Sequence, residues 1–239
     1  CSSDLDVSGQ DLTQFKLWYS QAGTPEVTAK SHYDADKKTF TLSLSQHIPD
    51  TPNQTNKKPH HIPVAFGLLD KNGTDIIGTQ ILHLKDKAEN FIFENIATRP
   101  VPSILRNFSA PVRLTTDLSE DDLRFLMVHD SDGFNRWESA QTLTMRLIGR
   151  MLDAMESGHN AVTDRAYLDT VSALLEQAYN DKGDKALIAR MLSLPDYSII
   201  GQERSIIYPD HIHSVLTRIR YDVLTECSAA LEKLYTKLN

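Results

Sequence analysis

The sequence predicts an immunoglobulin-like β-sandwich of about seven strands, followed by an all-α helical bundle or superhelix segment. Apolar and polar residues alternate in short runs between residues 26 and 117, which is the period of half-buried strands. After residue 118 the apolar spacing becomes that of amphipathic helices. The chain has 239 residues, of which 40% are hydrophobic, and this is enough for two domains of about 100–150 residues each.

The first residues predict the end of a helix rather than a complete element. Phe15 and Trp18 belong to a short apolar stripe, and Gly23 then offers the left-handed cap that ends many helices. Pro25 prevents the helix from continuing. Because a helix this short is marginal by itself in water, we expect residues 1–24 to be the last helix of a larger preceding domain.

The sandwich is expected over residues 25–118. Phe40, Leu42 and Leu44 alternate with small polar residues, and the apolar run Ile62–Leu69 ends at an Asp-Lys-Asn-Gly turn. Seven short strands separated by turns in about 95 residues are typical of a sandwich. The expected strands cover residues 27–33, 40–45, 62–69, 76–84, 91–96, 103–108 and 112–116.

The helical domain is expected over residues 119–239. Ser119 is followed by three acidic residues in a capping-box pattern, and Gly158 and Pro195 mark later helix ends. Successive helices without strands indicate an α-solenoid or bundle. We expect the domain to be an incomplete superhelix, because its last helix carries no polar cap. The expected helices cover residues 120–129, 134–156, 164–179, 186–194 and 209–238.

Charge and cysteine content exclude several classes of function. The 25 Lys and Arg against 32 Asp and Glu give a net charge of -7, which disfavours binding to nucleic acid or to an anionic membrane. The sequence contains neither a membrane-spanning apolar run nor a signal-peptide pattern. Cys1 and Cys227 are too few for a disulfide framework, so we expect two free thiols and a cytoplasmic location.

A search for catalytic chemistry gives no candidate catalytic, substrate-binding or metal-ligating residue. None of the nine histidines is followed by Glu, which excludes the H-E-x-x-H zinc motif. His60 and His61 lie at a loop-to-strand junction, and His211 and His213 fall on different faces of a helix start. Without carboxylate or thiolate ligands nearby, solvated or capping histidines fit better than a metal site.

The segment Asp130-Ser131-Asp132-Gly133 has some features of a calcium loop. A complete EF-hand needs more ligands and a distant Glu, and Glu138 comes too early for this role. A turn between two helices fits better, with Asp132 or Asn135 capping the second helix.

Four long phrases of the sequence resemble one known family. These are FKLWYSQAGTP, LSLSQHIPDTPNQTNKKPHHIPVAFGLLDKNG, FIFENIATRPVPSILRNFSAPVRL and LRFLMVHDSDGFNRWESAQ, in this order. They resemble the middle of the gluzincin zinc aminopeptidases of the bacterial aminopeptidase N type. The resemblance is densest from residue 12 to about residue 145 and looser in the later helices.

The resemblance implies a four-domain parent enzyme. Residues 1–24 would be the terminal helix of a missing catalytic domain, residues 25–118 the whole sandwich, and residues 119–239 the first part of the superhelix. None of the family's functional motifs can be carried over: the H-E-x-x-H, the zinc-ligand Glu, the G-A-M-E-N motif and the transition-state Tyr have no counterpart here. Residues 153–157 (DAMES) look like G-A-M-E-N, but they end a predicted helix and we interpret them as a coincidence.

We therefore expect a non-catalytic structural segment of a zinc-dependent aminopeptidase that removes N-terminal amino acids from peptides. Zinc would belong to the parent enzyme, and this segment would bind none and be inactive alone. The sandwich would link the catalytic domain to the helical domain that covers the active-site cleft. The alternative is a self-contained module, with a sandwich and helical repeats, that binds a protein partner.

The expected partners are the missing catalytic domain and the rest of the helical domain of the same chain. The parent enzyme would also bind peptide substrates. We expect binding to neither nucleic acid nor a membrane. Surfaces that face absent domains should be apolar, and the candidates are Phe15, Trp18, Leu231 and Leu234. Self-association through these patches is therefore expected.

Overall fold

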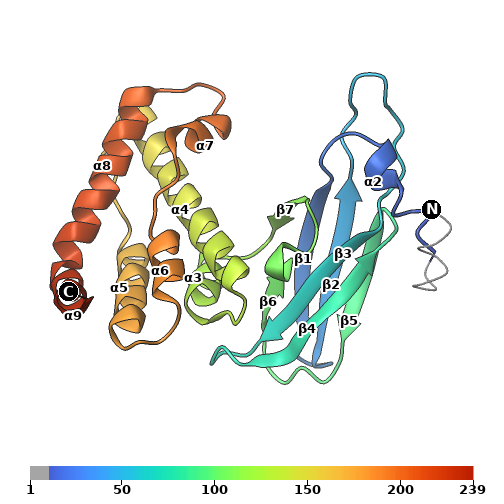
Figure 1. Ribbon diagram of the computed structural model, residues 1–239, viewed down its shortest axis with the longest axis horizontal. Helices are drawn as coiled ribbons and strands as arrows, with labels where there is room; N and C mark the ends of the chain where they lie inside the picture. Colours follow the sequence, from blue (N-terminus) through green and yellow to red (C-terminus); the bar gives the residue numbers. More distant parts are fainter. Residues whose placement is uncertain (1–10, 239) are drawn as a thin grey trace. The chain divides into compact units, whose positions relative to one another are not determined.

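Two compact units make up the structure, a computed structural model that describes residues 11–238. The chain passes from unit 1 to unit 2 between Leu118 and Ser119. Figure 1 shows mainly strands in the first unit and helices in the second, along the colour gradient. Between residues 11 and 238, no helix is both long enough and apolar enough to cross a lipid bilayer.

Unit 1 is a β-sandwich with seven strands among its described residues, which confirms the predicted fold class. One sheet has the strand order β5-β2-β1-β7 and the other β4-β3-β6. Neighbouring strands are antiparallel except β1 and β7, which run parallel. The strands are β1 (Glu26–Asp34), β2 (Thr39–His47), β3 (Ile62–Leu69), β4 (Asp75–Leu84), β5 (Ala88–Phe93), β6 (Val101–Ile104) and β7 (Arg113–Thr116).

The two sheets enclose one apolar core. The alternation in β2 turns Phe40, Leu42 and Leu44 inward, where none is more than 2% exposed. From the facing sheet, Phe66 stacks on Phe93 with ring centroids 5.0 Å apart. Because each large apolar side chain contributes about 1.5–3 kcal/mol when it is fully buried, this core holds the two sheets together.

Strand β6 is shorter than the strand predicted over residues 103–108, because the chain turns at its end. Leu105 and Asn107 have left-handed backbone, with φ of 65° and 53°, and residues Arg106–Phe108 form the short 3-10 helix η1. This turn directs the Arg106 side chain into the sandwich, where the residue is 1% exposed. The sequence pattern could not show that a charged side chain would occupy this position.

The buried guanidinium of Arg106 has an acceptor for each of its three nitrogens. Its Nε donates to Ser103 Oγ at 2.8 Å, and its Nη1 donates to Thr79 Oγ1 at 2.9 Å. Its two terminal nitrogens also donate to the two carboxylate oxygens of Asp75, at 2.6 and 3.2 Å. A buried charge is tolerated only with such partners, so this ion pair is part of the sandwich core.

Unit 2 is all-helical, as predicted. Ser119 caps its first helix: the Ser119 Oγ accepts from the Asp122 N–H at 3.1 Å, and the Asp122 carboxylate accepts from the Ser119 N–H at 3.2 Å. This is the capping box that the sequence indicates. The helices are α3 (Glu120–His129), α4 (Gly133–Glu156), α5 (Arg165–Tyr179), α6 (Lys185–Met191), α7 (Tyr197–Gln202), α8 (Pro209–Glu226) and α9 (Ser228–Leu238).

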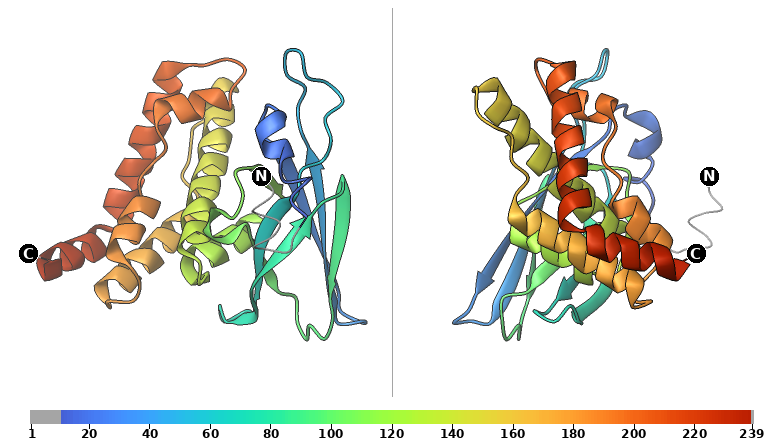
Figure 2. Two further views of the ribbon diagram at one scale, coloured as in Figure 1. Left: turned by 45° about the vertical axis from the view of Figure 1, so that its right-hand side comes forward. Right: turned by 90° about the vertical axis from the view of Figure 1, so that its left-hand side faces the viewer.

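The single helix predicted over residues 209–238 is wrong, because the structure has two helices there. Cys227 has non-helical backbone between α8 and α9, and Figure 2 shows α9 turned away from the axis of α8. The Cys227 thiol is 2% exposed and lies 3.2 Å from Ser172 Oγ of α5. The bend therefore occurs where the chain contacts a neighbouring helix. The sequence analysis also missed α7, which follows Pro195.

Candidate functional site

The described residues do not fit a catalytic metal centre. Nowhere in residues 11–238 do three or more His, Cys, Asp or Glu side chains come close enough together to hold a metal ion. Cys1 lies outside the described residues, and Cys227 is a buried free thiol. Asp132 caps α4 by accepting from the Asn135 N–H at 2.8 Å, which is the turn that the sequence predicts for this segment.

Other residues that the sequence singles out take part in structural contacts. His213 Nδ1 lies 2.9 Å from the Tyr197 hydroxyl, whereas the His211 ring lies 5.1 Å from the Tyr208 ring. Within residues 153–157, Asp153 and Glu156 both pair with Arg204, at 2.7 and 2.6 Å. These two carboxylates therefore attach the chain after α7 to the end of α4.

The strongest candidate for a functional surface is the seam between the N-terminal residues and the sandwich. We call residues 12–22 the junction segment. It contains helix α2 (Leu17–Ser20), which has only four residues. The structure places this segment in the same compact unit as the sandwich. Its assignment to a preceding catalytic domain stays a prediction.

Polar side chains join the junction segment to the backbone of the sandwich at both of its ends. Gln14 Nε2 donates to the carbonyls of Pro59 and Lys85, at 3.1 and 2.6 Å. Gln21 both donates to the Lys58 carbonyl at 2.9 Å and accepts from the Lys58 N–H at 2.8 Å. Such bonds to main-chain groups set the position of the segment along the loop that precedes β3.

Trp18 attaches the middle of the junction segment. Its indole Nε1 donates to the His61 carbonyl at 3.1 Å, and its ring lies 4.6 Å from the imidazole of His60. The indole also packs against the apolar core of the sandwich. Trp18 therefore combines apolar burial with one directed hydrogen bond, as buried tryptophans usually do.

His60 is buried behind Trp18, so its expected solvated or capping role is wrong. The residue is 1% exposed, and its backbone is held by Gln46, whose side chain accepts from the His60 N–H and donates to its carbonyl, both at 2.8 Å. Among the described residues, neither imidazole nitrogen has a hydrogen-bond partner. Burial lowers the pKa of His60 from 6.5; the Leu17 carbonyl opposes this shift and the Lys57 ammonium adds to it.

His61 is paired with His83, a neighbour that the sequence does not reveal. The His61 Nε2 lies 2.9 Å from His83 Nδ1, and the two ring centroids are 5.0 Å apart. His83 comes from β4, opposite Pro63 of β3. Burial, the Lys85 charge and His83 lower the pKa of His61, whereas Glu89 raises it.

Lys57 closes the other side of the seam. Its ammonium donates to the carbonyls of Ala22 and Pro49, at 2.7 and 2.6 Å, and to Thr51 Oγ1 at 2.9 Å. Gly23 has the predicted left-handed backbone, with a φ of 97°, but its predicted role as the helix cap is wrong, because α2 ends at Ser20 with Gln21 as its extended C-cap. One lysine therefore fixes both the exit of the junction segment and the polar loop before β3.

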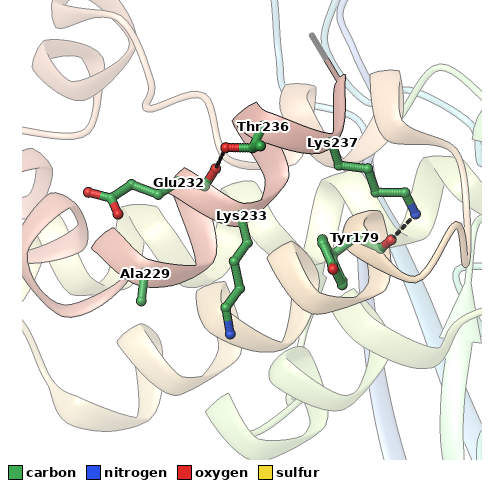
Figure 3. A pocket seen from close by; sticks show the side chains of 6 residues that line it. All are labelled: Tyr179, Ala229, Glu232, Lys233, Thr236 and Lys237. Carbon is green, nitrogen blue, oxygen red and sulfur yellow. Dashed lines mark hydrogen bonds between the residues drawn. The ribbon is translucent and has the colours of Figure 1, made fainter.

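Two pockets in unit 2 contain few side chains that could take part in catalysis. An open pocket of about 460 Å³ lies between α5 and α9, and Figure 3 shows Lys237 pointing across it to the Tyr179 carbonyl. Lys237 also pairs with Asp181, so its ammonium already has a carboxylate partner within the chain. An apolar pocket of about 80 Å³ is lined by residues such as Val171, Leu175 and Val223. Arg220 and Tyr167 also line this pocket, but most of its lining is apolar.

The residues that the sequence analysis proposed for apolar interfaces differ in exposure. Phe15 is 37% exposed, whereas Trp18 is half-buried against the sandwich. Leu231 and Leu234 are half-buried. The sequence analysis missed the roles of Gln14, Gln46 and Lys57, because their partners lie between 6 and 71 positions away along the chain.

Known protein families match both units. Residues 23–117 match a domain of unknown function (DUF3458) described as having an Ig-like fold. Residues 120–239 match a domain of unknown function (DUF3458_C) described as ARM repeats.

Full-length relatives and one solved structure match nearly the whole chain. The chain is 35% identical to Aminopeptidase N of Escherichia coli strain K12 over 238 residues, which are 96% of the chain and 27% of the relative. It is 30% identical to Aminopeptidase N of Haemophilus influenzae over 235 residues, 95% of the chain and 27% of that relative.

A crystal structure of Legionella pneumophila aminopeptidase A in complex with aspartic acid matches with a TM-score of 0.80 and 27% identity. This match covers 98% of the chain and 26% of that structure. The chain thus spans about a quarter of the length of the proteins it matches.

Proposed function

The chain belongs to the DUF3458_C family of ARM-repeat domains, whose model covers half of it, and we propose that it is a non-catalytic part of a zinc-dependent aminopeptidase. In this proposal the parent enzyme removes N-terminal amino acids from peptides. The sandwich links a catalytic domain to a helical domain, and the helical domain covers the active-site cleft.

The similarity to aminopeptidases over nearly the whole chain is the observation that carries this proposal. Three Aminopeptidase N relatives, including that of Caulobacter vibrioides, align with 95–98% of the chain at 30–35% identity. The alignments extend across both units, so the order of sandwich and helices is shared as well as the fold of each.

The seam supports a linking role for the sandwich. The junction segment is held by side chains of Gln14, Trp18, Gln21 and Lys57 rather than by a free hinge. A domain that precedes this segment would therefore be positioned on the sandwich by several directed contacts. Such contacts favour one arrangement over a flexible connection.

The proposal assigns no catalytic step to this chain. The side chains described between residues 11 and 238 do not provide a three-ligand metal site, so they do not fit the zinc centre of an aminopeptidase. We propose that zinc, peptide substrates and the catalytic residues belong to the parent enzyme. The scarcity of cysteine fits a cytoplasmic parent.

A domain exchange tests the proposal. In the Escherichia coli Aminopeptidase N, the aligned quarter is replaced by this chain, and hydrolysis of an aminoacyl p-nitroanilide is measured with zinc present. We expect the exchanged enzyme to be active, whereas the relative without this quarter and this chain alone are inactive.

Two results would contradict the proposal. One is zinc-dependent hydrolysis by this chain alone. The other is an exchanged enzyme that folds, as judged by its thermal unfolding, but has no activity. The second result would favour the alternative of a self-contained binding module.

A further inference from the structure

A chain of contacts links three histidines to one tryptophan at the seam. His60 contacts the Trp18 ring, the His61 carbonyl accepts the indole N–H, and His83 bonds to the His61 ring. They come from the end of the loop before β3 and from β4, and Trp18 belongs to α2. Histidine is the side chain whose charge changes most readily between pH 5 and 8, so a cluster at a docking surface can respond to protons.

We propose that His60, His61 and His83 form a proton-sensitive clasp, which holds the junction segment on the sandwich when the imidazoles are neutral and releases it when they are protonated. The clasp concerns contacts within this chain. It therefore does not rest on the proposed function.

The position of His60 provides the first step of the argument. Protonation would place a charge on a side chain that is 1% exposed and that lies against the indole of Trp18. The charge acting on it from the neighbouring loop is the Lys57 ammonium, which would repel an imidazolium. The Leu17 carbonyl of α2 could accept a hydrogen bond from the ring, but one carbonyl does not replace the water that the charge would lose. Undocking of Trp18 would return the ring to water.

The pair of His61 and His83 provides the second step. A bond between two ring nitrogens 2.9 Å apart needs a lone pair on one of them, so double protonation removes it. The charges that face His61 are Lys85 after β4 and Glu89 of β5, and they act in opposite directions. The His61 backbone carries the acceptor for Trp18, so the paired side chain and the docking bond belong to the same residue.

The direction of the pH dependence follows from proton binding. The pKa values of His60 and His61 lie below 6.5 when the segment is docked, so the docked form binds fewer protons than the released form. The docking constant is therefore at its maximum above about pH 6.5 and falls as the pH drops from 6.5 towards the lowered values. For each linked proton, the docking constant falls about tenfold per pH unit in this window.

Trp18 provides the measurement. The sequence contains two tryptophans, so a Trp137→Phe variant leaves Trp18 as the single indole reporter. Its emission is followed from pH 8 to pH 5, together with amide protection of residues 16–21 by NMR hydrogen exchange. We expect red-shifted emission and lost protection with a midpoint below pH 6.5, while the amides of β2 and β3 stay protected.

Three variants test the assignment. His60→Leu removes the buried titrating group, and His83→Gln removes the partner of His61. Both are expected to move or flatten the Trp18 transition. His47→Gln, at an exposed strand histidine, is the matched control and should leave the transition unchanged.

The clasp is overturned if Trp18 shows no transition between pH 8 and 5. It is also overturned if β2 and β3 lose protection at the same pH, because this means global unfolding. If His60→Leu does not fold, an unchanged transition in His83→Gln rules out the paired histidines and overturns the clasp as proposed. A shifted transition in this variant supports it.

Discussion

The guanidinium of Arg106 lies directly over Gly67, so that a Cβ added to this glycine would stand 2.4 Å from Arg106 Cζ. Gly67 is paired with Ser103 across strands β3 and β6, and Ser103 also accepts from Arg106 Nε. The absence of a side chain at residue 67 is therefore what gives the buried cation its space.

Gly67→Ala is expected to destabilise the sandwich by about 1–3 kcal/mol, because the guanidinium is fixed by Asp75 and Thr79 and cannot move aside easily. Urea unfolding followed by Trp18 emission in the Trp137→Phe background measures this change. Gly78→Ala in β4 is the matched control, since an added Cβ would meet nothing within 4 Å. It should change the stability by less than about 0.5 kcal/mol. Equal effects of the two substitutions would contradict the steric explanation.

Arg106→Met is expected to cost about 3–5 kcal/mol, because it leaves the Asp75 carboxylate without its main partner in a partly buried site. Arg106→Lys should also be destabilising, since an ammonium cannot reproduce the two-pronged bond. Arg113→Met serves as the control: this side chain is 77% exposed and pairs with Glu26 at 3.7 Å. Its loss should cost no more than about 1 kcal/mol. Thermal unfolding of the three variants gives the comparison.

Lys57→Met is expected to loosen the loop before β3 and the end of the junction segment together. Three acceptors lose one charged donor, and the expected loss of stability is about 1–3 kcal/mol. Hydrogen exchange at residues 20–23 and 49–57 reports it. Lys58→Met is the control, because Lys58 contacts Gln21 through its backbone, which the substitution leaves intact. A similar increase of exchange in both variants would argue against the role of the Lys57 ammonium.

Asp181 is expected to keep α9 in place over a wide pH range. Hydrogen bonds from Lys185 and then Lys237 lower the pKa of Asp181 from 3.8 to about 2. A lowered carboxyl pKa means that the contribution is complete above pH 3.8 and is lost only as the pH falls through about 2. Asp181→Asn should therefore increase hydrogen exchange in α9 at pH 7. Near pH 2, the same substitution should change hydrogen exchange in α9 only slightly.

The same substitution at Asp169 is the control for this prediction, because Asp169 pairs with Arg165 within α5. Unchanged exchange in α9 of the Asp181→Asn variant at pH 7 would show that the carboxylate does not hold this helix.

The elements with a strong local pattern could be predicted from the sequence. Strand β3 has the predicted bounds, Ile62–Leu69, because a continuous apolar run followed by a turn leaves few alternatives. The capping box at Ser119 is equally local, since its two partners lie three residues apart. Such features need no knowledge of the rest of the fold.

The features that were missed depend on contacts between distant residues. The strand predicted to include Arg106 ends early, because the guanidinium pairs with Asp75, which is 31 positions away. The bend at Cys227 depends on contact with Ser172 of α5, 55 positions away. The docking of Trp18 could not be predicted either, because its acceptor is a backbone carbonyl, a group that every residue has and that no residue type indicates. Tertiary contacts thus decided each of these local structures.

The parallel pairing of β1 with β7 has a mechanical consequence. Glu26 lies opposite Arg113 and Ala29 opposite Thr116, so the strand that enters the sandwich runs alongside the strand that leaves it, in the same direction. A force that stretches the chain would pull the start of β1 and the end of β7 apart along the strand axis. The hydrogen bonds of this pair would then be loaded together in shear rather than broken one after another. The pairing of β1 with β7 should therefore resist tension that is applied between the two ends of the sandwich.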